Sequence, residues 1–248
     1  MKYKLTLSYV GTHFFGWQIQ PSQPSIQANI EHALGVILRT SVNLVGCGRT
    51  DTGVHAKNYV AHFEIENEII DFGLFLHKIN GLIHRDIAIH DIEAVNDDFH
   101  ARFDAVSRAY TYHLHTRKNP FLNLSSFLFK PQLDIEKMNE AAKLLLTHKD
   151  FQCFSKSKTQ VHTYLCDVYE AKWTKLNDEQ LVFYIKANRF LRNMVRAVVG
   201  TLLEVGTGEK SIADFQAVLE SKNRSLAGKS VPAHALCLTE ITYPHYAK

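Results

Sequence analysis

The sequence is organised around one stretch, Cys47-Gly48-Arg49-Thr50-Asp51-Thr52-Gly53-Val54-His55-Ala56. Apolar, strand-like runs at residues 44–47 and 60–65 flank it. Because glycine adopts backbone angles that other residues avoid, Gly48 and Gly53 predict a tight, sharply turned loop at the end of a strand. A carboxylate on such a loop points outward from a rigid base, which suits a catalytic group. An ordinary Asx-turn in a surface hairpin is the alternative for Asp51.

The composition indicates a globular protein with a substantial core. The chain has 248 residues, of which 46% are hydrophobic, enough for one large domain or two small ones. A net charge of +3 is compatible with a polyanionic partner but does not establish one. No apolar run approaches the length of a membrane span and no signal peptide is recognisable, so we expect a cytoplasmic protein without membrane association. The scattered cysteines predict reduced, mostly buried thiols: Cys47, Cys153, Cys166 and Cys237.

The first half of the chain predicts the order strand, helix, strand, strand, helix, strand. Alternating residues indicate strands at 3–10 and 87–95, and two more flank the Asp51 loop. Apolar residues at helical spacing indicate a helix at 26–39, with Ser25 as its N-cap, and a second helix capped by Asp71. This order is the split βαβ, ferredoxin-like arrangement, an antiparallel sheet with helices on one face.

The second half repeats that plan in its pattern of elements. We expect an α+β chain of two ferredoxin-like halves, residues 1–104 and 105–248, which form one mostly antiparallel sheet with helices packed on it. Residues 119–132 and 151–162 lack a pattern and are interpreted as insertions. The elements predicted here are strands at 108–115, 163–173, 180–187 and 236–243, a helix after Asp134, and helices at 191–205 and 211–219.

Several chemistries can be weighed on motifs alone. The letters Asp51-Thr52-Gly53 also occur in aspartic proteases, but those enzymes need two facing carboxylates and this chain has one copy of the motif. The 14 histidines show no metal-ligand spacing, and no phosphate loop or dinucleotide fingerprint is present. We therefore expect neither a metal nor a cofactor.

Residues 48–56 closely resemble the signature of the TruA family of tRNA pseudouridine synthases. Thr52 stands where alanine is commoner in the family, and Ala235 where glycine is commoner. Neither departure changes a reacting group. The resemblance spans the chain and implies the pseudouridine synthase fold, with the second half completing the active-site cleft. Its further motifs, in the family's order, are residues 9–18, 98–103, 108–112, 190–196 and 234–238.

The resemblance implies an isomerase that converts the uridines at tRNA positions 38 to 40, in the anticodon stem-loop, to pseudouridine. The uracil–ribose bond breaks, the base turns, and it rejoins through carbon 5, so no cofactor or metal is needed. Cleavage develops oxocarbenium character at C1′, which a carboxylate stabilises, as in glycosidases. By the resemblance Asp51 is that essential aspartate. The sequence leaves open whether it acts as a nucleophile or as a base at C2′.

The resemblance assigns roles to further residues. Arg196 is the cation that keeps the carboxylate ionised, and Tyr110 stacks on the flipped base. We further expect Arg49, close to Asp51 in sequence, to fill the space that the base leaves, and Leu236 to form an apolar wall of the pocket. The ordinary alternatives are a solvated helix charge for Arg196, a core aromatic for Tyr110, a surface salt bridge for Arg49 and core packing for Leu236. Candidates for phosphate contacts, each of which is more often a solvated charge, are Lys156, Lys158, Arg189, Arg192 and Lys229.

The partners implied are the anticodon arm of tRNA and a second copy of the chain, with one tRNA crossing both subunits of a homodimer. Helical spacing also places Arg192 and Arg196 on one stripe of the predicted helix. The main rival is a non-catalytic RNA-binding protein, because ferredoxin-like sheets with exposed aromatics bind RNA without chemistry. A pure binder would tolerate Asp51→Asn.

Overall fold

The chain folds into two compact units. The computed structural model describes residues 1–156 and 162–244. One unit comprises Met1–Val106 together with the described residues from Leu238 onward, and the other comprises Ser107–Cys237. Across these described residues there are nine strands and five α-helices, an α+β composition.

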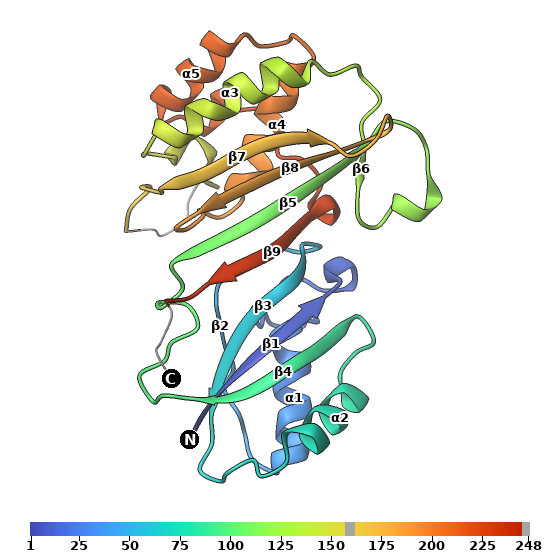
Figure 1. The fold of residues 1–248 in the computed structure, drawn as a ribbon, viewed down its shortest axis with the longest axis vertical. Coiled ribbons are helices and arrows are strands. Elements are labelled where there is room, and N and C mark those ends of the chain that lie inside the picture. Colours follow the sequence, from blue (N-terminus) through green and yellow to red (C-terminus); the bar gives the residue numbers. More distant parts are fainter. Residues whose placement is uncertain (157–161, 245–248) are drawn as a thin grey trace. The chain divides into compact units, whose positions relative to one another are not determined.

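The first unit is an antiparallel sheet with two helices. The strands β1 (Lys2–Tyr9), β3 (His55–Glu64) and β4 (Ile87–Val95) are ordered β4-β1-β3, and the short β2 (Val45–Gly46) pairs with β3. The helices α1 (Ile26–Leu38) and α2 (Phe72–Leu82) contact each other, and α2 packs on β4 (Figure 1). Alternate residues of β1 are buried, as a sheet covered on one face requires.

The predicted helix caps of this unit are confirmed. The Ser25 hydroxyl accepts a hydrogen bond from Ala28 N at 3.2 Å, and the Asp71 carboxylate accepts one from Leu74 N at 2.9 Å. Each bond satisfies a backbone N–H that the first helical turn leaves without a partner. Both helices therefore begin where the sequence pattern places them.

The second unit has a sheet ordered β5-β8-β7, made of β5 (Ser107–His115), β7 (Val168–Lys175) and β8 (Gln180–Ala187). The helix α3 (Ile135–Thr147) packs on β7, and both α4 (Met194–Gly206) and α5 (Ile212–Ser221) pack against α3 (Figure 1). The region expected to be an irregular insertion contains a short strand, β6 (Phe127–Leu128), which pairs parallel to β5.

The last strand, β9 (Leu236–Thr242), leaves the second unit and runs into the first. Its neighbours in the first unit hold it there: Asn58 Nδ2 donates to Thr239 O and Val106 N donates to Thr242 O, both at 2.8 Å. The sequence pattern places all of residues 105–248 in the second half. Hydrogen bonds between residues far apart in the chain instead bring the described residues from 238 onward into the first unit.

Three predicted boundaries were wrong by three residues or more. The strand-like run at 60–65 is part of β3, which begins at His55. The helix expected at 191–205 begins at Met194, because its N-cap Asn193 has the left-handed angles φ 68° and ψ 0°. Arg192 therefore lies before the helix and does not share a stripe with Arg196. The strand expected from residue 163 begins only at Val168.

The predicted burial of the four cysteines is confirmed, and each is a free thiol. Burial raises the pKa of Cys153 to about 12 and that of Cys166 to about 11, so both remain protonated and unreactive at neutral pH. Over the described residues, no helix is long and apolar enough to cross a membrane.

Candidate active site

Asp51 begins a tight turn in the connection between β2 and β3. Val54 N donates to Asp51 O at 3.1 Å, which closes a four-residue turn with Gly53 at its third position. Gly53 has φ +80°, as a type II turn requires there. The role predicted for Gly53 is confirmed. That predicted for Gly48 was wrong, because Gly48 has no positive φ and a Cβ atom there would meet nothing within 4 Å.

Buried hydroxyl and aromatic groups support the residues that lead into this turn. Thr50 Oγ1 and Tyr9 Oη are 2.8 Å apart in a buried hydrogen bond. The Tyr59 hydroxyl donates to the carbonyl of Gly48, and its ring stacks on Trp17 with centroids 4.0 Å apart. The backbone on both sides of residue 49 is therefore fixed. Asp51 stands on the rigid base that a catalytic carboxylate needs.

The segment before α1 packs backbone to backbone against the Asp51 loop. A Cβ atom on Gly16, whose φ is +89°, would lie 2.4 Å from Thr50 O, and one on Gly11 would lie 2.1 Å from Val54 O. Gly11 N also donates to Nδ1 of the buried His55 at 2.9 Å. Sequence reasoning did not foresee these supports. The signal that could have revealed them is a pair of glycines enclosing an aromatic segment.

Within the Asp51 loop, Asp51 itself is half-buried and Arg49 is exposed. Arg49 forms no ion pair with any residue in 1–156 or 162–244, so the surface salt bridge weighed for it finds no support. The other predicted site residues within the described ranges belong to the second unit.

Arg196 is anchored by its own unit. It is half-buried on α4, its Nε donates to Val231 O at 2.7 Å, and its carbonyl accepts from Val231 N at 3.2 Å. The solvated helix charge weighed for Arg196 is therefore wrong. Tyr112 donates to Pro232 O at 2.9 Å, and burial raises its pKa strongly even though Arg196 opposes the rise. Tyr112 therefore remains a neutral donor.

The two tyrosines of β5 differ in accessibility. Tyr112 is fully buried, whereas Tyr110 is half-buried and meets Phe190 edge to face at 5.2 Å. Tyr112 is thus the core aromatic of the pair, and Tyr110 keeps accessible ring surface. Leu236, the first residue of β9, is 5% exposed, as core packing requires.

Two of the predicted phosphate-contacting residues, Lys156 and Arg192, lie at the N-terminus of α4, and a third, Lys229, lies further along this helix. Lys156 N donates to Arg192 O at 3.0 Å. The side chain of Asn193, the N-cap, donates to Ser230 Oγ at 2.7 Å. The preceding residue, Lys229, lies with its carbonyl against Gly200, in the middle of α4. All three basic residues are exposed, and the helix dipole adds positive potential at the N-terminus of α4, beside Lys156 and Arg192. Arg189 is half-buried nearby in sequence, and Lys158 lies outside the described residues.

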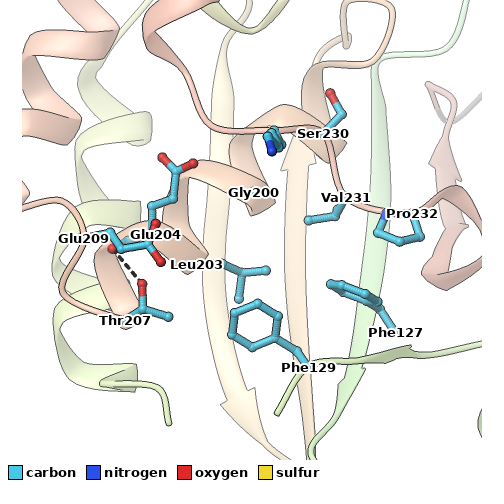
Figure 2. A pocket seen from close by; sticks show the side chains of 11 residues that line it. Phe127, Phe129, Gly200, Leu203, Glu204, Thr207, Glu209, Ser230, Val231 and Pro232 are labelled. Carbon is cyan, nitrogen blue, oxygen red and sulfur yellow. Dashed lines mark hydrogen bonds between the residues drawn. The ribbon is translucent and has the colours of Figure 1, made fainter. Parts of the chain in front are cut away.

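A cavity of about 240 Å³ lies behind the segment that anchors Arg196 (Figure 2). Phe127 and Phe129 line one part of it, and Glu204 and Glu209 another. Lys229 also lines the cavity, which therefore adjoins the basic residues, but the phenyl rings and carboxylates of the lining do not suit a phosphate backbone. No group of three potential metal ligands occurs in the part of the chain that the structure describes.

Comparison with known proteins identifies the class. The family model described as tRNA pseudouridine synthase matches residues 6–104 and 141–244. The tRNA pseudouridine synthase A of Parabacteroides distasonis is 49% identical, over 98% of this chain and 96% of that protein. That of Porphyromonas gingivalis is 47% identical, over 98% and 97%, and that of Bacillus subtilis 38% identical, over 98% and 99%.

Among solved structures, one chain of a Cbf5-Nop10-Gar1 complex matches with a TM-score of 0.35 and 12% identity, over 95% of this chain and 57% of that one, which is too weak a likeness to bear on the fold. The sequence matches define a pseudouridine synthase, an enzyme of the isomerase class. The chain belongs to the TruA family of tRNA pseudouridine synthases.

Proposed function

We propose that this enzyme isomerises uridines in the anticodon stem-loop of tRNAs, at tRNA positions 38 to 40, with Asp51 as its essential carboxylate. The observation that carries the proposal is the rigid turn that presents Asp51. Its backbone is held by the Thr50–Tyr9 hydrogen bond and by Tyr59, and Asp51 itself is half-buried. A preorganised negative charge stabilises the positive charge that develops at C1′ when the uracil–ribose bond breaks.

Two routes remain for Asp51. As a nucleophile it attacks C1′ and releases uracil, and carbon 5 of the turned base later displaces the carboxylate. As a base it removes the proton from C2′, and that proton returns when the new bond to carbon 5 forms. Deuterium at C2′ distinguishes the routes, because only the second breaks a C2′–H bond and gives a primary isotope effect.

The target base has to leave its stack, which costs a few kcal/mol. We propose that Tyr110 stacks on the flipped base, that Arg196 serves as the cationic partner of Asp51, and that Leu236 forms an apolar wall. Arg49 is exposed and can occupy the vacated space. The exposed basic residues Lys156, Arg192 and Lys229, which lie around α4, are suited to phosphate contacts. We propose the same role for Arg189 and Lys158.

The finer architecture is part of the same proposal. The order β4-β1-β3, with β2 on β3, supports a ferredoxin-like first half, and the order β5-β8-β7 supports a second. We propose a cytoplasmic homodimer in which one tRNA contacts both subunits, because a weakly basic chain offers little surface to a large RNA.

Tritium release tests the proposal. Rearrangement expels the hydrogen on carbon 5, so unmodified tRNA carrying 5-tritiated uridine reports each turnover. We expect release by the wild type in buffer with chelator, none by Asp51→Asn, and unchanged tRNA binding by that variant. Asp91→Asn, an equal loss of charge at an exposed position on β4, is the matched control and should keep the wild-type rate. No release by the wild type from any unmodified tRNA, with binding intact, would leave an RNA-binding protein.

A further inference from the structure

A tight turn follows β4, and it comprises residues 99–104; we call it the Phe103 turn. Asp104 Oδ2 accepts from His100 N at 2.8 Å, and Asp104 N donates to His100 O at 3.1 Å. His100 Nδ1 accepts from the backbone N–H groups of Arg102 and Phe103, both at 3.2 Å. These bonds leave the turn little conformational freedom. The proposed chemistry at Asp51 makes no use of it.

The Phe103 turn is also anchored to the body of the first unit. Ala101 is fully buried, its N–H donates to His62 Nδ1 at 3.1 Å, and its carbonyl accepts from Tyr243 Oη at 2.6 Å. The buried ring of Phe99 lies 5.4 Å from that of Tyr243, and Lys2 Nζ donates to Phe99 O at 3.0 Å. Anchors from β1, from β3 and from the end of β9 therefore hold one short turn.

This anchored turn presents an aromatic ring to solvent. The side chain of Phe103 is 73% exposed. The His100 imidazole lies against its ring at 4.3 Å with an interplanar angle of 32°, and Arg102 Cζ lies 5.5 Å from the ring centroid. A flat ring beside an imidazole and a guanidinium differs from an apolar protein-docking patch. It has the composition of sites that stack unpaired bases and attract the neighbouring phosphates.

We propose that Phe103 is a stacking platform for an unpaired base of the RNA substrate, with Arg102 and His100 beside the adjoining backbone. The proposal rests on the proposed function, which makes an RNA the substrate. The ring is preorganised by the turn, so stacking costs little ordering entropy. Because every base has a π-face, such a platform contributes affinity without selecting a sequence.

The platform acts away from the reacting uridine. His55 follows the Asp51 turn at one end of β3, and His62, which anchors Ala101, lies seven positions further along the strand. At a rise of about 3.3 Å per residue, the two ends are about 23 Å apart. The segment after β4 lies at the end of the sheet near the N-terminus (Figure 1). Loss of the ring should therefore weaken tRNA binding and leave the chemical step unchanged.

Three substitutions separate stacking from general apolarity: Phe103→Ala, Phe103→Leu and Phe103→Trp. We expect alanine and leucine to raise the Kd for unmodified tRNA about 10-fold, which is about 1.4 kcal/mol, and tryptophan to keep it within about 2-fold. Tritium release in single turnover at saturating tRNA should match the wild type in all three. The matched control is Phe121→Leu. The ring of Phe121 is 93% exposed and, among the described residues, contacts neither a basic side chain nor a histidine ring, so this substitution should leave Kd unchanged.

The outcomes separate this proposal from the proposed function. Wild-type Kd for Phe103→Leu, while Asp51→Asn still abolishes release, overturns the platform and leaves the enzyme function standing. If Phe103→Leu and Phe103→Trp both change the oligomeric state measured by sedimentation, and the Kd for tRNA changes with that state, the platform is overturned. Phe103 would then lie at an interface between copies of the chain. Absence of both tRNA binding and tritium release in the wild type refutes the proposed function itself.

Discussion

Replacing Gly16 with alanine tests whether close backbone packing positions the Asp51 loop. The new Cβ atom would lie 2.4 Å from Thr50 O and 3.1 Å from Asp51 C, both backbone atoms. Real Cβ contacts are essentially never under 3.0 Å, so Thr50 O would have to move by at least about 0.6 Å. Since Thr50 directly precedes Asp51, this displacement reaches the carboxylate. Gly48→Ala, whose Cβ meets nothing within 4 Å, is the matched control within the same loop.

The magnitudes follow from strain and displacement. Alanine at φ +89° costs about 1–2 kcal/mol, before any cost of the steric overlap. For a chain of this size each kcal/mol lowers Tm by roughly 2–4 °C, so we expect the strain alone to make Gly16→Ala melt about 2–8 °C below the wild type. Misplacement of a reacting group by about 1 Å can cost about 100-fold in rate. We expect a single-turnover rate about 10- to 100-fold lower, with tRNA affinity within about 3-fold.

The assay combines thermal unfolding, a tRNA-binding measurement and single-turnover tritium release at a temperature where both variants are folded. Gly48→Ala should melt within about 2 °C of the wild type and lose at most a few-fold in rate, because it changes neither φ nor packing. A wild-type rate for Gly16→Ala would refute the reasoning. An equal loss of rate in both variants would also refute it, because Gly48→Ala lacks the contact with Thr50 O and that contact could not then account for the loss.

Two further predictions concern stability. Burial, with the nearby charges of His100 and Lys2, lowers the pKa of the 5% exposed His62 from 6.5 to about 4. The unfolded chain takes up this proton near pH 6.5 and the folded chain does not, so the stability is constant above pH 6.5 and falls by up to about 3 kcal/mol as the pH drops towards 4. Urea unfolding at pH 7.5 and 4.5 should show this loss, and His62→Asn should reduce it. In Gly200→Ala the new Cβ would lie 1.9 Å from Lys229 O, so we expect the free energy of unfolding to fall by about 1–3 kcal/mol. Gly35→Ala in α1 should instead raise the free energy of unfolding by about 0.5–1 kcal/mol, measured by the same urea denaturation.

Features that depend on neighbours in sequence were predictable. Ser25 and Asp71 cap helices as expected, because a cap is a hydrogen bond across three residues. Gly53 was found for a similar reason, since a type II turn demands a positive φ at a defined position. The motif letters around Asp51 likewise indicated the family that the comparisons show.

Features that depend on a distant neighbour were not predictable. Gly48 and Gly53 look alike in the sequence, and only the tertiary structure shows that a Cβ atom on Gly48 would meet nothing within 4 Å. The left-handed Asn193 moved the start of α4 to Met194, and its side chain bonds Ser230, a residue 37 positions away. No periodicity in the surrounding residues records such a bond.

By itself, the sequence determined the order of the helices and of the longer strands, the caps at Ser25 and Asp71, and the family through short motifs. These properties follow from local geometry, in which each residue acts on the few that surround it. Only the tertiary structure decided which groups support Asp51, what anchors Arg196, and that Phe103 is presented on a fixed turn. The reason is that Tyr9 and Thr50, Arg196 and Val231, and Ala101 and Tyr243 are far apart along the chain, and only folding brings their hydrogen-bonding groups within reach of each other.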